Sequence, residues 1–135
     1  MTAVYLKGGR FDMKNAALYV RTANAETEEI INQTGRLESY VKNIGDMEVG
    51  KLYVDHNHSG VDFKRAGLNE LLADALNKKM DCIVIRDFSR LGRDYVKVLA
   101  LMKLLRHLNI RLISIDEKYD SFSERKCALW QESQE

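Results

Sequence analysis

Residues 82–94 read CIVIRDFSRLGRD, and this stretch organises the rest of the chain. Its first four residues are apolar, as in a strand that is buried on both faces. Arg86, Arg90 and Arg93 then crowd into eight residues ahead of a segment with helical periodicity. Guanidinium groups between a buried strand and a helix suit the binding of phosphate. Arg90 and Arg93 are expected to share one face at the start of that helix, with Asp94 supporting its N-terminal end.

The composition restricts the classes of protein that fit. The chain has 135 residues, enough for one domain with a sizeable core, and a formal net charge of +1. Local clusters, rather than a general basic field, would therefore have to hold a nucleic acid. No apolar run is long enough to span a bilayer, and no secretory signal is recognisable. Cys82 and Cys127 are interpreted as small buried residues without metal-ligand spacing, which predicts an intracellular, cytoplasmic protein in a reducing compartment.

Hydrophobic periodicity predicts alternating strands and helices. This alternation indicates an α/β fold with an open, mostly parallel central sheet and helices on both faces. A lead-in segment is expected over 1–14, one domain over 15–122, and the start of a C-terminal helix over 123–135. Strands are expected at 16–20, 49–54, 82–85 and 110–115, and helices at 26–44, 68–76 and 95–108.

Ligands of such sheets bind outside the carboxyl ends of the strands, where the strand order reverses. Three loops are expected to leave these ends, residues 21–25, 55–65 and 86–93, and each contains arginine. The topology therefore predicts that arginines distant in the sequence converge around an anionic ligand. Such a cluster fits phosphoryl transfer in which guanidinium groups stabilise the charged phosphate.

Other chemistries fit the sequence less well. Residues 22–25 contain no glycine, so the glycine-rich turn of a nucleotide-binding fold is missing. A phosphoacceptor domain built on Asp87 would need an acidic pair after the first strand to hold magnesium, but Arg21 stands there. Residues 55–58 hold one aspartate and two histidines, which are interpreted as a polar loop in preference to a metal site.

Four segments carry motifs in the order and spacing of a known family. Residues 19–23 read YVRTA, residues 87–94 read DFSRLGRD, and 32–41 and 55–72 hold matching polar and leucine positions. Over about 16–121 the combination resembles the catalytic domain of the serine site-specific recombinases, the resolvase/invertase family. The family motifs at these places are Tyr-x-Arg-x-Ser, Asp…Tyr-Ser-Gly…Arg-Pro-Gly…Leu-Leu and Asp-Arg-Leu-Gly-Arg. Among members of this family, the motifs of this sequence most resemble those of the large serine recombinases and the transposon-type members.

The resemblance implies a DNA strand transferase that needs no metal and no other cofactor. In the family a serine hydroxyl attacks a DNA phosphodiester and forms a 5′-phosphoserine link, which stores the bond energy until the strands are rejoined. The implied partners are DNA and further copies of the chain, as a dimer and, during strand exchange, a tetramer, with no membrane. Tyr19 would pack beneath the phosphate-binding shell. Carried over residue by residue, the catalytic set comprises the nucleophile position Ala23 with Arg21, Gln33, Ser59, Arg65, Arg90 and Arg93.

The nucleophile position departs from the family pattern. Ala23 has no hydroxyl, so the phosphoserine link cannot form and the chain is predicted to be inactive as written. Thr22 is adjacent, but neighbouring side chains on an extended segment point to opposite faces. Ser89 stands where many relatives carry aspartate, His58 replaces the usual tyrosine, and Ala66 replaces the usual proline.

Two further functions stay open from the residues alone. One is a non-catalytic DNA-binding or oligomerising regulator of an active recombinase, which would keep the phosphate grip or the pairing surface. The other is an interaction domain without a DNA role. The sequence given ends at Glu135, scarcely into the long helix with which family members continue, so both a catalytic-domain fragment and a truncated relative are expected alternatives.

Overall fold

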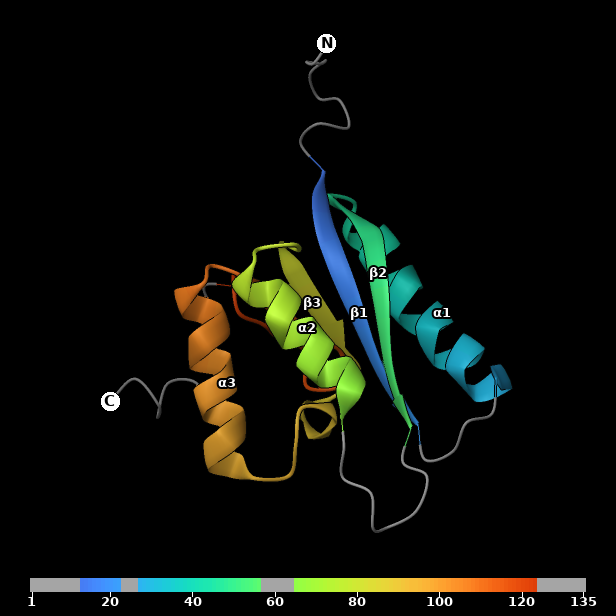
Figure 1. The fold of residues 1–135 in the computed structure, drawn as a ribbon. Helices are drawn as coiled ribbons and strands as arrows, with labels where there is room; N and C mark the ends of the chain where they lie inside the picture. Colours follow the sequence, from blue (N-terminus) through green and yellow to red (C-terminus); the bar gives the residue numbers. More distant parts are fainter. Residues whose placement is uncertain (1–12, 23–26, 57–64, 124–135) are drawn as a thin grey trace.

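A computed structural model describes residues 13–22, 27–56 and 65–123 (Figure 1). The alternation of strands and helices that the sequence predicts is confirmed within these ranges. The elements follow in the order β1 (Lys14–Thr22), α1 (Thr27–Ile44), β2 (Met47–His56), α2 (Ala66–Leu76), β3 (Cys82–Ile85), the short 3-10 helix η2 (Phe88–Arg90), α3 (Tyr95–His107), β4 (Arg111–Ser114) and β5 (Tyr119–Asp120).

The described strands form one five-stranded sheet in the order β2-β1-β3-β4-β5. β1 pairs in parallel with β2 on one side and with β3 on the other, and β3 pairs in parallel with β4. The two-residue strand β5 is antiparallel to β4. The mostly parallel sheet is therefore confirmed, and the strand order reverses between β1 and β3. Ligand sites of such sheets lie outside the carboxyl ends of the strands at this reversal.

Helices cover both faces of the sheet, with α1 on one face and α2 and α3 on the other (Figure 1). The alternation of side chains along β1 explains the two layers. Ala17 and Tyr19 pack in the cluster that includes α2 and α3, whereas Leu18 and Val20 pack in the cluster with α1. A strand buried on both faces reads as a continuous apolar run, as the strand segments of this sequence do.

Each helix contributes one apolar stripe to these clusters. The buried positions recur three or four residues apart, which places them on one face of the helix. They are Leu37 and Val41 in α1, Leu68, Leu71 and Ala75 in α2, and Val98, Met102 and Leu105 in α3.

Some details differ from the sequence-based expectations. The strands β1 and β2 extend beyond the expected 16–20 and 49–54, and neither β5 nor η2 was expected. The expected common helical face of Arg90 and Arg93 is wrong. Arg90 ends η2, while α3 begins only at Tyr95, with Gly92 at a φ of +153° between the two arginines. Asp94 does cap α3 as expected, because its carboxylate accepts hydrogen bonds from the backbone N–H groups of residues 96 and 97.

Most of the lead-in segment and most of the expected C-terminal helix lie outside the described residues. In the part of the chain that the structure does describe, no helix has the length and apolar character needed to cross a membrane.

Candidate functional site

Asp55 is a buried carboxylate at the carboxyl end of β2, with 6% of the residue exposed. Its Oδ1 accepts a hydrogen bond from the Gly67 backbone N–H at 2.7 Å, and its Oδ2 accepts one from the Leu68 N–H at 2.9 Å. These donors belong to the first turn of α2, where N–H groups lack partners within the helix and the helix dipole favours negative charge. Asp55 therefore fixes the start of α2 against the end of β2.

Gly67 makes this close approach possible. A Cβ atom at position 67 would lie 2.6 Å from the carbonyl oxygen of Val54 and 3.1 Å from Cγ of Asp55. Any larger side chain would push α2 away from β2. The glycine thus determines where the chain immediately before α2, including Arg65, meets the sheet.

Tyr19 links Asp55 to Arg65. The Tyr19 hydroxyl donates a hydrogen bond to Oδ2 of Asp55 at 2.6 Å and accepts one from Nη2 of Arg65 at 3.0 Å. Burial and the hydrogen bond to Asp55 raise the pKa of Tyr19 to about 12. Near neutral pH the phenol is therefore a fixed donor to the carboxylate beneath Arg65.

Arg65 also holds the loop that follows β3. We call residues 86–93 the arginine loop. Nη1 of Arg65 donates to the carbonyl oxygen of Leu91 at 3.0 Å, and Nη2 donates to the carbonyl oxygen of Arg90. The planar guanidinium thus satisfies three acceptors, one on β1 and two in the arginine loop, which the single ammonium of lysine could not match in geometry.

Arg90 extends the chain of contacts from the arginine loop to β1. Its Nη1 donates to the carbonyl oxygen of Arg21 at 3.1 Å, and its Nε lies 3.5 Å from Oδ2 of Asp87. Asp87 also caps η2 by accepting from the Ser89 N–H at 2.9 Å. Positions 21, 65 and 90, which are far apart in the sequence, are therefore tied together at the carboxyl ends of the strands.

Comparison with known proteins decides the family. A family model described as "Resolvase, N terminal domain" matches residues 16–130, most of the chain. The chain belongs to the resolvase family. The comparison with curated proteins found no match.

Solved structures of serine recombinases share the fold of this resolvase-family chain. The N-terminal catalytic domain of TP901-1 integrase has a TM-score of 0.72 at 28% identity, covering 89% of this chain and 88% of that one. A resolvase family site-specific recombinase from Streptococcus pneumoniae has a TM-score of 0.69 at 21% identity, with 82% and 78% covered. The C-terminal catalytic domain of ISC1926 TnpA, an IS607-like serine recombinase, has a TM-score of 0.65 at 22% identity, with 75% and 69% covered.

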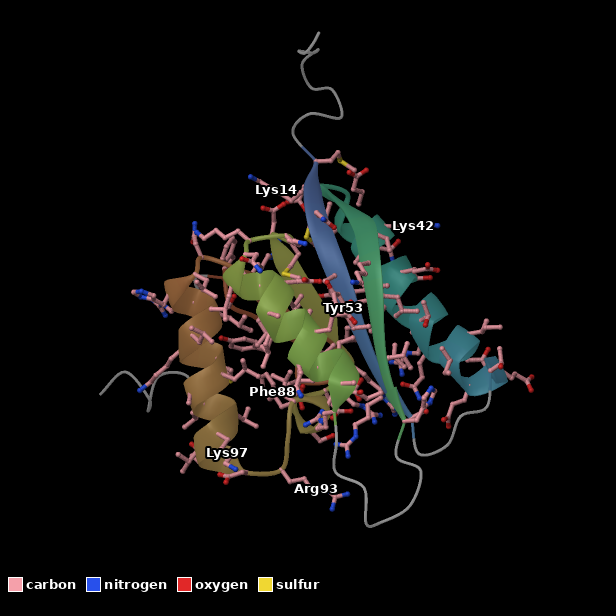
Figure 2. All side chains as sticks on the ribbon, viewed as in Figure 1. Lys14, Lys42, Tyr53, Phe88, Arg93 and Lys97 are labelled. Atoms are coloured by element: carbon pink, nitrogen blue, oxygen red, sulfur yellow. The ribbon has the colours of Figure 1, made fainter. Side chains whose placement is uncertain are left out.

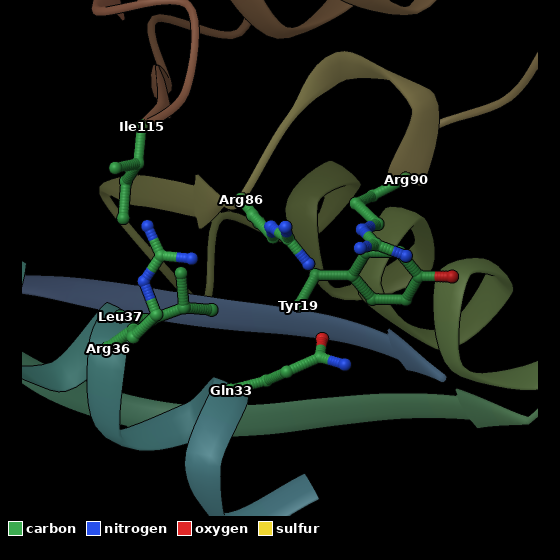
Figure 3. Close-up of a pocket in the computed structure, with 7 residues that line it drawn as sticks. All are labelled: Tyr19, Gln33, Arg36, Leu37, Arg86, Arg90 and Ile115. Atoms are coloured by element: carbon green, nitrogen blue, oxygen red, sulfur yellow. The ribbon is translucent and has the colours of Figure 1, made fainter. Parts of the chain in front are cut away.

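The structure brings together some of the positions that the family motif predicts. Arg65 and Arg90 meet as described, and Arg90 reaches the backbone of Arg21. Gln33, on α1, is half-buried and lines a pocket that Tyr19 and Arg90 also line (Figure 3).

The other predicted positions do not join this cluster in the described residues. Arg93 is exposed and lies at the edge of the molecule in the turn before α3 (Figure 2). Ala23 and Ser59 lie outside the described residues. Thr22, the neighbour of the nucleophile position, is 2% exposed, and its hydroxyl lies 3.3 Å from Nδ1 of His56, so this hydroxyl is engaged within the sheet. Ser89 donates its hydroxyl to Asp87.

Two parts of this arrangement were missed by sequence reasoning. Asp55 binds the first turn of α2, which requires α2 to approach β2 so closely that only glycine fits at position 67. The spacing of Asp55 and Gly67 in the sequence was the available signal for this contact. Arg86 and Asp116 also lie at this end of the sheet, because Asp116 follows β4 and its Oδ2 lies 3.3 Å from Nε of Arg86. The position of Asp116 after a strand end could have located it.

The residues described by the structure contain no group of three or more His, Cys, Asp and Glu side chains arranged to hold a metal ion. His58, which belonged to the less favoured metal interpretation of the 55–58 segment, lies outside the described residues.

Proposed function

We propose that residues 15–122 are the catalytic domain of a serine site-specific recombinase whose arginines hold a phosphate of the DNA backbone. The observation that carries the proposal is the position of Arg65. It binds Tyr19 and two carbonyl oxygens of the arginine loop at the strand-order reversal. A phosphate placed there would meet guanidinium groups from several loops, and these groups bind phosphate with paired, charge-assisted hydrogen bonds. Family membership supports the choice of DNA as the source of the phosphate.

The proposed roles follow the family motif. The guanidinium groups would neutralise the phosphate as charge develops on it, while Gln33 and Ser59 would support this shell. The working partners would be DNA and further copies of the chain, as a dimer and then a tetramer, in the cytoplasm, with no metal or cofactor. The arginines concerned are Arg21, Arg65, Arg90 and Arg93.

In this proposal the chain is inactive, because residue 23 is an alanine with a methyl group where the family has a serine hydroxyl. The test is Ala23→Ser, incubated with a supercoiled plasmid that carries the cognate recombination site. We expect covalent protein–DNA adducts that survive denaturing electrophoresis. The matched control is Ala23→Ser combined with Arg90→Ala, which should give at least 100-fold fewer adducts if Arg90 stabilises the reacting phosphate, a loss on the order of that seen when one such donor is removed. Failure of Ala23→Ser to form adducts would contradict a retained catalytic site.

The missing hydroxyl also favours a second candidate, a non-catalytic regulator that binds DNA or pairs with an active recombinase. This candidate predicts salt-sensitive DNA binding by the unsubstituted chain that weakens with Arg90→Ala, together with no adducts from Ala23→Ser. Insensitivity to both substitutions would leave an interaction domain without a DNA role.

A further inference from the structure

Two arginines that are not in the proposed phosphate-binding set share one carboxylate. That set consists of Arg21, Arg65, Arg90 and Arg93. Arg36 lies on α1, Arg86 follows β3, and Asp116 follows β4. Nη2 of Arg36 lies 3.6 Å from Oδ1 of Asp116, and Nε of Arg86 lies 3.3 Å from Oδ2. The Asp116 backbone N–H also donates to the carbonyl oxygen of Arg86 at 2.8 Å, which fixes the carboxylate next to that arginine.

Both arginines of this group line a pocket that Arg90 also lines. Arg36 and Arg86 line it together with Gln33, Tyr19 and Arg90 (Figure 3). The space open within it is only about 10 Å³, which corresponds to roughly one water molecule. A phosphate group therefore cannot enter the pocket as it stands, but it can lie across the mouth while the two outer guanidinium groups turn toward it.

The two ion pairs are weak enough to be exchanged. The side chains of Arg36, Arg86 and Asp116 are 56%, 43% and 39% exposed. Ion pairs at such exposure contribute little to stability and are screened by salt. A phosphate accepts paired hydrogen bonds from guanidinium as a carboxylate does, so it can replace Asp116 as the partner of both arginines.

We propose that Arg36 and Arg86 form a second phosphate-binding position, which takes a backbone phosphate of DNA next to the one proposed for Arg65 and Arg90, and that Asp116 occupies it in the free protein. The inference rests on the proposed function, because it takes the DNA backbone as the ligand. It assigns α1 a part in binding the DNA backbone through Arg36. It also makes Asp116 a competitor of the DNA.

The first test measures the binding of a short DNA duplex by fluorescence anisotropy over a series of salt concentrations. The Arg36→Ala/Arg86→Ala double variant should bind at least five-fold more weakly at low salt. Its slope of log affinity against log salt should be shallower by about 0.9, the value for one lost phosphate contact on duplex DNA. Lys42→Ala is a control for the loss of one surface cation, because Lys42 is an exposed residue in the last turn of α1, six residues after Arg36 (Figure 2). It should change both quantities much less.

The second test removes the competitor. Asp116→Asn should tighten DNA binding at least two-fold, and this gain should disappear when Arg36 and Arg86 are also replaced by alanine. Glu38→Gln is the control, because it removes one negative charge from α1 without touching this group. Thermal unfolding followed by circular dichroism checks that all variants remain folded.

The outcomes separate this inference from the function on which it rests. If Arg90→Ala weakens binding but the double variant behaves like Lys42→Ala, the second position is overturned and the proposed function stands. Equal effects of Asp116→Asn and Glu38→Gln would overturn the competition by Asp116. If the unsubstituted chain binds no DNA at low salt, both the second position and the DNA-binding function are overturned.

Discussion

Two tyrosine–aspartate pairs in this molecule have the same geometry and different surroundings. Tyr19 donates to Asp55 at 2.6 Å, and Tyr53 donates to Asp74 at 2.6 Å. The first pair is buried at the carboxyl end of the sheet, and its carboxylate also binds two N–H groups of α2. The second joins β2 to α2. Tyr53 is itself buried, but Asp74 is half-buried, and its Oδ2 lies 3.5 Å from Nζ of the exposed Lys51.

The comparison of the two pairs indicates which contacts organise the candidate site. A polar group that water can reach replaces a lost hydrogen bond with one to water. When a buried carboxylate loses its donors, or buried donors lose their carboxylate, polar groups are left without partners. The Tyr19–Asp55 pair also connects β1, β2 and α2 to Arg65, whereas the Tyr53–Asp74 pair joins only β2 and α2. The buried pair should therefore control both stability and the position of Arg65.

The largest effect is expected from Asp55→Ala. Three buried donors, two backbone N–H groups and the Tyr19 hydroxyl, would lose their acceptor, so we expect the free energy of unfolding to fall by about 3 kcal/mol or more. Asp74→Ala should cost clearly less, because the half-buried Asp74 binds one tyrosine donor and no backbone N–H group of α2. Urea denaturation measures both losses, and equal losses would contradict the distinction between the two pairs.

Gly67→Ala should come next. Its Cβ would lie 2.6 Å from the Val54 carbonyl oxygen, so α2 must shift, and we expect a loss of about 2 kcal/mol. The matched control is Gly35→Ala within α1, where a Cβ meets nothing within 4 Å. That substitution should stabilise the protein by about 0.5–1 kcal/mol, because glycine is costly inside a helix. A loss at both positions would mean that the close approach at Gly67 is not what matters.

Tyr19→Phe should lower the free energy of unfolding by about 1–2 kcal/mol, since Asp55 and Arg65 each lose a partner. It should also change the response to alkali. The pKa of Tyr19 is raised from 10.0 to about 12, so between these values the folded state keeps a proton that the unfolded chain releases, and stability falls as the pH rises. The variant should show a shallower fall over this window in denaturation curves recorded from pH 9 to about 12. An unchanged slope would contradict the buried position of the phenol.

The smallest effect concerns the Tyr53–Asp74 pair. The hydrogen bond from Tyr53 holds the pKa of Asp74 below its usual value of 3.8. Any stabilisation from this group is present above pH 3.8 and is lost as the pH falls through the lower, folded-state pKa. Carboxyl NMR titration should find the low pKa, and Tyr53→Phe should move it back toward 3.8 without disturbing the Tyr19–Asp55 pair.

Much of the fold could be predicted from the sequence because both faces of the sheet are covered. The continuous apolar segments and the 3.6-residue spacing of leucines determine which segments are strands and which are helices. Short elements carried no such signal. β5 pairs through only two residues, and η2 is one turn that is capped by the carboxylate of Asp87. Neither element is long enough to show a hydrophobic periodicity in the sequence.

The loops that contribute to the candidate site could be predicted from the sequence. The parallel topology indicates that Arg21, Arg65 and Arg90 meet at one edge, and their contacts agree with this. The directions of the side chains were not predictable, because they depend on local backbone geometry. Arg65 turns inward to carbonyl oxygens, while Arg93 faces outward because the chain turns at Gly92 before α3 begins. The catalytic roles of all these residues stay predictions.

The inward position of Arg65 has a consequence for the cost of binding. Its hydrogen bonds to three acceptors hold Arg65, the residue immediately before α2, against β1 and the arginine loop. Much of the conformational entropy that a flexible loop would lose on meeting a polyanion has therefore been lost during folding. An incoming anion encounters a preorganised surface, and more of its interaction energy is left to appear as affinity.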